Sequence, residues 1–172
     1  TYSVVLGDYD NDGDLDFVMG NWGQSNKVFR NDGGLNLTEI WSSAELDNTL
    51  STSWGDYDND GYLDILVGND NTSPDRIYRY DDILGTFTLI INTIMNDYTY
   101  SIKWADYDND GDLDFVVTNG EYSDPIRIYK SLEADFGNVN STPTIPTTLT
   151  TEYTEGTLKL KWNYGSDTET TQ

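Results

Sequence analysis

Three aspartate-rich nonapeptides hold the residues of this chain whose types and spacing could do chemistry. They read DYDNDGDLD at 8–16, DYDNDGYLD at 56–64 and DYDNDGDLD at 106–114. Aspartates at positions 1, 3, 5 and 9 supply oxygens that converge when the chain curls, and glycine at position 6 permits the left-handed backbone of a sharp turn. The predicted metal ligands are Asp8, Asp10, Asp12, Asp16, Asp56, Asp58, Asp60, Asp64, Asp106, Asp108, Asp110 and Asp114.

Calcium is the ion that best suits these loops. All-oxygen, carboxylate-rich and flexible coordination favours calcium over zinc or copper. Magnesium is the main competitor, although its strict octahedral geometry suits a roomy loop less well. Position 7 is Asp14, Tyr62 and Asp112 in the three copies, so we assign to it only a backbone carbonyl. We therefore predict three Ca²⁺ ions, one in each loop, with a structural role.

Two other interpretations of the nonapeptides are disfavoured. An EF-hand loop would carry glutamate at position 12 between two helices, but this position is Met19, Val67 and Val117, in segments predicted to be strands. Ordinary turns are also rich in Asp, Asn and Gly. A single loop could be explained in that way, whereas the same pattern in three loops favours a cation site.

Short apolar segments flank each nonapeptide and are predicted to be β-strands. They are rich in β-branched and aromatic residues and are separated by Gly, Asn and Asp, which is typical of strands and turns. Two such segments are apolar at consecutive positions, Phe17 to Met19 and Ile65 to Val67, which predicts strands covered on both faces. No helical period survives across a unit, so we expect an all-β fold. The four predicted strands of each copy lie at 3–7, 15–21, 26–32 and 35–41, at 51–55, 63–69, 75–81 and 85–91, and at 101–105, 113–119, 126–132 and 134–140.

The pattern DxDxDGxxD, preceded by WG or WA and followed by an LDFVV-type strand, resembles the FG-GAP and VCBS repeats. These repeats form the blades of the integrin alpha-subunit propeller and of many secreted bacterial proteins. The resemblance covers about residues 2–136 and implies three four-stranded blades, at about 2–50, 51–100 and 101–136, of an incomplete β-propeller. Three blades cannot close a ring, and the resemblance implies a seven-bladed parent. Leu6 departs from the tryptophan of the other two copies.

The composition changes after the third copy. Residues 137–146 are rich in Pro, Thr, Ser and Asn and are predicted to be a linker. The segments TLTTEY at 148–153 and TLKLKWNYG at 157–165 alternate like two strands. Residues 147–172 are similar to the opening of a fibronectin type III domain, which implies a partial β-sandwich segment. The sequence starts at Thr1 without a methionine and stops at Gln172 in a polar run, so we expect it to be an excerpt from a longer polypeptide.

The overall composition excludes several functions. With 31 Asp and Glu against 9 Lys and Arg, the net charge of -22 argues against nucleic acid and anionic membranes as partners. No apolar run approaches the roughly 18 residues of a membrane span, so no membrane insertion is expected. The chain contains neither Cys nor His, which excludes disulfides, thiolate chemistry, His-based zinc sites and His general bases. The 13% of aromatic residues argue against a disordered acidic tail.

The predicted function is that of a calcium-binding β-propeller module in a secreted or cell-surface protein. The resemblance implies adhesion or the binding of an extracellular protein or polysaccharide, with the remaining propeller blades of the parent chain as further partners. We expect no enzymatic activity. The alternative is a part of a polysaccharide-degrading lyase or hydrolase. Five aromatic residues recur beside the loops, and we assign them to packing between blades rather than to sugar stacking: Tyr9, Tyr57, Tyr107, Trp54 and Trp104.

Overall fold

The computed structural model describes residues 1–34, 36–70, 72–92, 98–120, 126–131, 149–154 and 157–162. The chain divides into two compact units, Thr1–Leu132 and Glu133–Gln172. All regular structure in the described ranges is β-strand, as the sequence predicts. Within these ranges no helical segment has the length and the apolar character needed to cross a bilayer.

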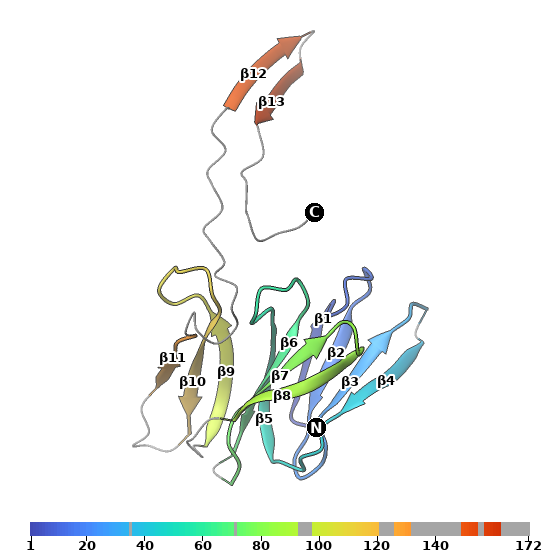
Figure 1. The fold of residues 1–172 in the computed structure, drawn as a ribbon, viewed down its shortest axis with the longest axis vertical. Helices are drawn as coiled ribbons and strands as arrows, with labels where there is room; N and C mark the ends of the chain where they lie inside the picture. The colour runs from blue at the N-terminus through green and yellow to red at the C-terminus, as the bar shows by residue number, and fades with distance from the viewer. Residues whose placement is uncertain are drawn as a thin grey trace. The chain divides into compact units, whose positions relative to one another are not determined.

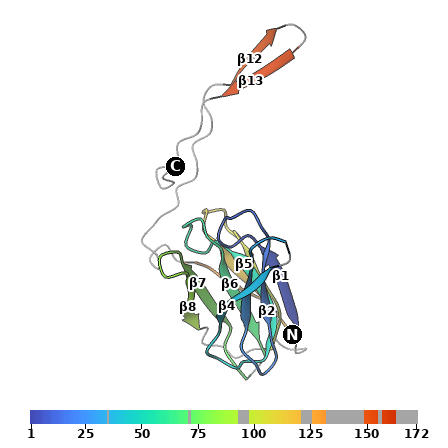
Figure 2. The ribbon, with the colours of Figure 1, turned by 90° about the vertical axis from the view of Figure 1, so that its right-hand side faces the viewer.

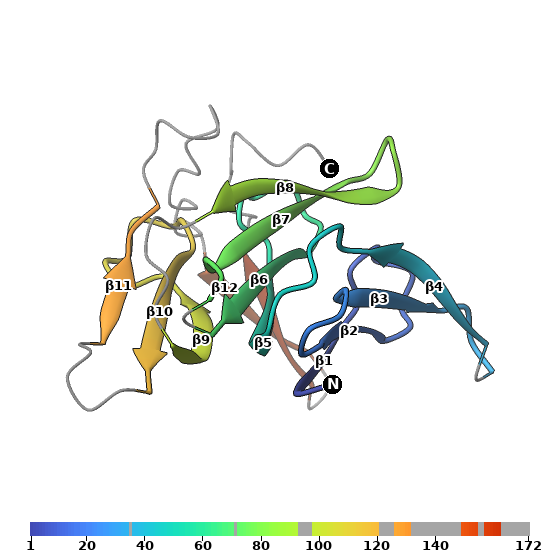
Figure 3. The ribbon, with the colours of Figure 1, turned by 90° about the horizontal axis from the view of Figure 1, so that it is seen from below.

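The first unit contains three antiparallel sheets in which consecutive strands are neighbours (Figures 1 and 3). The first sheet comprises β1 (Ser3–Gly7), β2 (Asp16–Gly20), β3 (Lys27–Asn31) and β4 (Leu37–Ser42). The second comprises β5 (Thr49–Gly55), β6 (Asp64–Asn69), β7 (Arg76–Asp81) and β8 (Thr86–Asn92). The third comprises β9 (Thr99–Ala105), β10 (Asp114–Asn119) and β11 (Arg127–Tyr129).

The second sheet is packed between the other two, since β5 contacts both β1 and β9. For this reason every residue of β6 is buried, and Ile65, Leu66 and Val67 are each 0% exposed. The prediction of a strand covered on both faces is therefore confirmed for the second sheet. It is wrong for the first, where Val18 is buried but Phe17 and Met19 are half-buried, because the described residues cover only one face of that sheet.

Most of the predicted strands lie within the described residues. The predicted fourth strands at 35–41 and 85–91 correspond to β4 and β8. The predicted strand at 134–140 and the predicted linker at 137–146 lie outside the described residues, and the third sheet has three strands among those that the structure describes.

In the second unit, β12 (Leu149–Thr154) and β13 (Thr157–Trp162) form an antiparallel hairpin (Figure 2). The register runs from Leu149 opposite Trp162 to Thr154 opposite Thr157. Two adjacent strands are what the sequence predicts here, while the fibronectin type III assignment stays a prediction.

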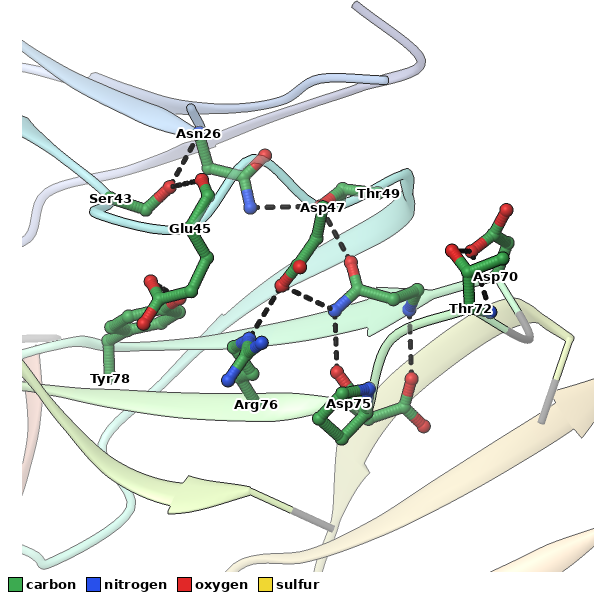
Figure 4. A network of polar contacts seen from close by, with 12 residues as sticks. Asn26, Ser43, Glu45, Asp47, Thr49, Asp70, Thr72, Asp75, Arg76 and Tyr78 are labelled. Carbon is green, nitrogen blue, oxygen red and sulfur yellow. Dashed lines mark hydrogen bonds and ion pairs between the residues drawn. The ribbon is translucent and has the colours of Figure 1, made fainter. Parts of the chain in front are cut away.

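Hydrogen bonds join the first two sheets at the end of β6 remote from its nonapeptide (Figure 4). Asn26 Nδ2 donates to Thr49 Oγ1 at 2.9 Å, and Thr49 Oγ1 donates to Asn69 Oδ1 at 2.7 Å. Arg76 Nε contacts Asp47 Oδ2 at 2.6 Å beside them. Because Asn26, Thr49 and Asn69 are buried, these bonds satisfy polar groups that would otherwise be costly to remove from water. They fix how the two sheets meet.

Candidate metal centres

The nonapeptides are the hairpin loops between the first two strands of each sheet: loop 1 is 8–16, loop 2 is 56–64 and loop 3 is 106–114. Position 9 of each loop is the first residue of the following strand. The backbone is left-handed twice in each loop. Glycine at position 6 has φ of 93°, 93° and 98°, and asparagine at position 4 has φ of 61°, 57° and 59°. These two residues give the loop its tight curl, because asparagine tolerates this region better than most residues.

The aspartate at position 1 holds the curl by accepting backbone hydrogen bonds. In loop 2, Asp56 Oδ1 accepts from the Asp60 N–H at 3.0 Å and Oδ2 accepts from the Gly61 N–H at 2.9 Å. Loop 1 has the same two bonds, both at 3.1 Å. Loop 3 has the bond from Gly111 to Asp106 Oδ2 at 3.3 Å.

The aspartate at position 9 is the buried anchor of the loop. Asp64, which is 0% exposed, accepts from the Tyr57 N–H and from the Tyr80 N–H, each at 2.8 Å. Asp16 and Asp114 accept from the equivalent pairs of backbone groups in their own sheets. One carboxylate thus fastens the start of the loop and the third strand of the sheet to the second strand.

The aspartate at position 3 completes a group of three carboxylates in every loop. One oxygen from each member lies within 4.8 Å of the others in three groups: Asp8, Asp10 and Asp16; Asp56, Asp58 and Asp64; and Asp106, Asp108 and Asp114. Asp10 Oδ1 and Asp58 Oδ1 are buried, and no described residue forms a hydrogen bond with either atom. A buried anionic oxygen without a partner is costly, and a cation placed among the three carboxylates would satisfy it.

The aspartate at position 5 lies outside these groups. Oδ1 of Asp12, Asp60 and Asp110 accepts from the backbone N–H of position 7, at 2.9, 2.9 and 3.0 Å. This local turn uses one oxygen of each side chain. The structure therefore brings together nine of the twelve predicted ligands. The other three are the position 5 aspartates, and one of them lies at the exposed side of each loop.

Burial and mutual repulsion shift the acidity of these carboxyl groups. Burial raises the pKa of Asp64 to about 8, although its two backbone N–H donors act in the opposite direction. Burial, together with the neighbouring charge of Asp60, also raises the pKa of Asp58. Burial and the adjacent Asp12 have the same effect on the pKa of Asp10. Each raised pKa reports a site in which negative charge is poorly compensated by the protein alone.

These residues fit a calcium ion. The donors are all oxygen and mostly carboxylate, the loop is a flexible hairpin, and the site is partly buried, which suits a hard cation of variable coordination number. Two unit charges about 4 Å apart repel by roughly 1 to 4 kcal/mol, depending on the local dielectric. A bound Ca²⁺ would convert this repulsion into attraction and connect the two strands that the loop joins.

Position 4 connects neighbouring loops, a role that the sequence analysis did not predict. Asn11 Nδ2 donates to the Gly61 carbonyl at 2.8 Å, and Asn59 Nδ2 donates to Asp112 Oδ1 at 3.1 Å. Each asparagine therefore connects its own loop to the loop of the next sheet. The signal was present, because asparagine recurs at this position in all three copies.

Comparison with known proteins agrees with this geometry. A family model described as FG-GAP-like repeat matches the chain twice, over residues 8–67 and 56–117. Both matches begin at position 1 of a nonapeptide and reach into the second strand of the following sheet. Among curated proteins, none matches the chain.

Proposed function

Because the chain belongs to the FG-GAP-like repeat family, we propose that it is a calcium-binding β-propeller module in which the ion has a structural role. The observation that carries the proposal is the buried Oδ1 atom of Asp58, which has no hydrogen-bond partner among the described residues, in a side chain that is grouped with two further carboxylates. The same atom of Asp10 repeats this arrangement in loop 1.

The structural role is supported by what the loops connect. Position 1 follows the first strand of each sheet directly and position 9 begins the second. An ion held by both would fasten this hairpin in the way that the position 9 carboxylate already fastens the third strand. Since adjacent loops are bonded through Asn11 and Asn59, order in one loop would support order in the next.

We further propose that the parent protein is secreted or displayed at the cell surface. Calcium sites of extracellular modules have dissociation constants of about 10⁻⁴ to 10⁻³ M, and we expect about 10⁻⁵ to 10⁻³ M here. Such sites fill in extracellular fluids and would be poorly filled in the cytosol. The test is the location of the full-length protein in fractionated cells.

Adhesion or ligand binding is proposed in preference to catalysis. The chain has no His or Cys to serve as a general base or thiol nucleophile, and its strongly acidic surface disfavours polyanionic partners. The proposed ligand is an extracellular protein or polysaccharide, and the remaining propeller blades of the parent chain are the other proposed partners. Measurable cleavage of a glycan by this chain would overturn this choice.

The calcium proposal is tested by metal content and thermal unfolding. We expect three bound Ca²⁺ per chain after equilibrium dialysis and two for Asp58→Asn. Each of the two proteins should have a lower Tm in EDTA than it has in Ca²⁺. Asp82→Asn is the matched control, because it removes the same charge from an exposed residue of the β7–β8 turn. An unchanged Tm on adding Ca²⁺ to the metal-free protein would contradict the proposal. Stronger stabilisation by Mg²⁺ than by Ca²⁺ would change the assigned ion.

A further inference from the structure

A basic residue stands at the same place beside each acidic loop. Arg30 in β3, Arg79 in β7 and Lys130 directly after β11 each precede the residue whose backbone N–H binds the position 9 aspartate. The whole chain contains only 9 Lys and Arg against 31 Asp and Glu. Recurrence of a scarce residue type at one structural position in three repeats points to a function.

These basic groups contact the position 3 carboxylates to different degrees. Lys130 Nζ forms an ion pair with Asp108 Oδ2 in loop 3. In loop 2, Arg79 Nη1 lies 3.6 Å from Asp58 Oδ2. In loop 1 the equivalent Arg30 pairs instead with Asp32, its Nε lying 2.7 Å from Oδ1.

The acidic loops also differ in how far their position 3 carboxylates are buried. The Asp58 side chain is 10% exposed, whereas that of Asp108 is 28% exposed. A buried pair is screened less by water and salt than an exposed one. A fixed positive charge beside a ligand carboxylate offsets repulsion while no metal is bound, and it repels a divalent cation that enters the same group.

We infer that Arg79 and Lys130 are built-in counter-ions that lower the calcium affinity of loops 2 and 3, while the Asp32 carboxylate weakens the same effect in loop 1 by offsetting part of the charge of Arg30. This inference rests on the proposed calcium-binding function and assigns a regulation to it. Each loop thus binds calcium over its own range of calcium concentration, and a side chain that is not a metal ligand sets that range.

The test is a calcium titration of the full chain followed by NMR of three glycine amides. The N–H groups of Gly13, Gly61 and Gly111 bind the position 1 carboxylates, so each reports on its own loop. Removing the basic group by Lys130→Gln should raise the calcium affinity of loop 3, and Arg79→Gln should raise that of loop 2, each by about threefold to fivefold, which is the size expected of partly exposed ion pairs. In both variants the calcium affinities of the other two loops should stay within about twofold of their wild-type values.

Two control variants separate the local effect from the change in net charge. Lys27→Gln removes the same charge from β3, where Lys27 pairs with Glu39 at 2.7 Å, away from the loops. Arg79→Lys keeps the charge and should retain most of the wild-type affinity. If Lys130→Gln and Arg79→Gln shift the titrations no more than Lys27→Gln does, or if they weaken binding, the inference is wrong.

Loop 1 offers a double-mutant test. Asp32→Asn frees Arg30, so calcium binding reported by Gly13 should weaken about threefold, as expected of a partly exposed ion pair. The same substitution made in Arg30→Gln should have no such effect, because no basic group is then available. Equal effects of Asp32→Asn in both backgrounds would overturn this part.

The outcomes also distinguish this inference from the proposed function. If calcium moves none of the three glycine amides in the wild-type protein, calcium binding itself is wrong. If calcium moves them but the variants match Lys27→Gln, only the counter-ion inference is wrong. Unfolding in EDTA gives an independent readout, because Lys130→Gln should lower the Tm of the metal-free protein, in which Lys130 offsets the repulsion among the carboxylates.

Discussion

The indole ring of Trp54 lies nearly parallel to the phenol ring of Tyr9, with ring centroids 6.0 Å apart and 12° between the planes. Tyr9 belongs to loop 1 and Trp54 to β5, so this contact joins the first sheet to the second. Trp54 Nε1 also donates to the Val5 carbonyl at 3.1 Å. Trp104 stacks on Tyr57 at 5.1 Å and repeats the arrangement between the second and third sheets. The prediction of packing between sheets is thus confirmed for Tyr9, Trp54, Tyr57 and Trp104, whereas Tyr107 is 58% exposed and the prediction is wrong there.

Replacing this tryptophan should separate the first two sheets. We expect Trp54→Ala to lower the free energy of unfolding by about 2 to 4 kcal/mol, because a large half-buried aromatic group and a hydrogen bond are both lost. Urea unfolding at saturating Ca²⁺ measures the change. Trp22→Ala, at a side chain that is 40% exposed, is the control and should cost less than about 1 kcal/mol. Equal losses in the two variants would contradict the packing role.

The glycine after Trp54 is required by the next sheet. A Cβ atom on Gly55 would lie 2.4 Å from Cδ1 of Trp104, and one on Gly7 would lie 2.7 Å from Cδ1 of Trp54. We expect Gly55→Ala to displace Trp104 and to cost about 1 to 3 kcal/mol. The third sheet carries Ala105 at this place, so Ala105→Gly should change stability by less than about 1 kcal/mol. The NMR signal of the Trp104 indole N–H would report the displacement, and an unchanged chemical shift would refute it.

Positions 3 and 9 should respond differently to metal. Asp64→Asn replaces a carboxylate that accepts two backbone N–H bonds, and an amide can accept only one of them. We expect a loss of about 2 to 4 kcal/mol without Ca²⁺ and a larger loss with it, because Asp64 also belongs to the group of carboxylates that would hold the ion. Asp58→Asn should instead raise the Tm in EDTA, since it removes a buried charge, and lower it in Ca²⁺. Thermal unfolding under both conditions checks this, and parallel behaviour of the two variants would be inconsistent with separate roles.

The buried carboxyl group of Asp75 should make stability depend on pH. Burial raises the pKa of Asp75 from 3.8 to about 6, while hydrogen bonds from Asn69 and Thr99 act in the opposite direction. Because the folded state holds this proton more tightly than the unfolded state, the contribution is full below about pH 4 and is lost as the pH rises through about 6.

Asp75→Asn provides the test, because Asn26 already fills the equivalent place in the first sheet and bonds Thr49. The difference in unfolding free energy between the variant and wild type should rise in favour of the variant by about 2 to 3 kcal/mol between pH 4 and pH 7. Urea unfolding across this range measures it. A difference that does not vary with pH would show that Asp75 titrates normally.

The repeated nonapeptide made much of the fold predictable. Each copy marks where one strand ends and where the next begins. The segments predicted at 3–7, 51–55 and 101–105 therefore coincide closely with β1, β5 and β9. The half-exposure of Phe17 and Met19 could not be predicted, because their residue types resemble those of Ile65 and Val67. Whether a neighbouring sheet covers a strand is a property of tertiary packing and not of the strand itself.

In the candidate sites, the grouping at positions 1, 3 and 9 follows from the spacing of the aspartates. The turn made by Asp60 does not, because its side chain can reach either the ion or the backbone of Tyr62, and local geometry decides. The contact of Arg79 with Asp58 also joins residues remote in sequence. Only alignment of the third strands with one another would have shown that a basic residue recurs there.

The surroundings of Tyr9 bear on how the protein is made. Its ring contacts Trp54, Tyr80 and Phe87, with centroids 6.0, 5.0 and 5.6 Å away, and all three belong to the second sheet. During translation the first hairpin therefore emerges from the ribosome long before the partners of Tyr9 have been synthesised. The core around Tyr9 can close only after most of the second sheet has been synthesised. The first repeat therefore completes its folding while the second repeat is being made.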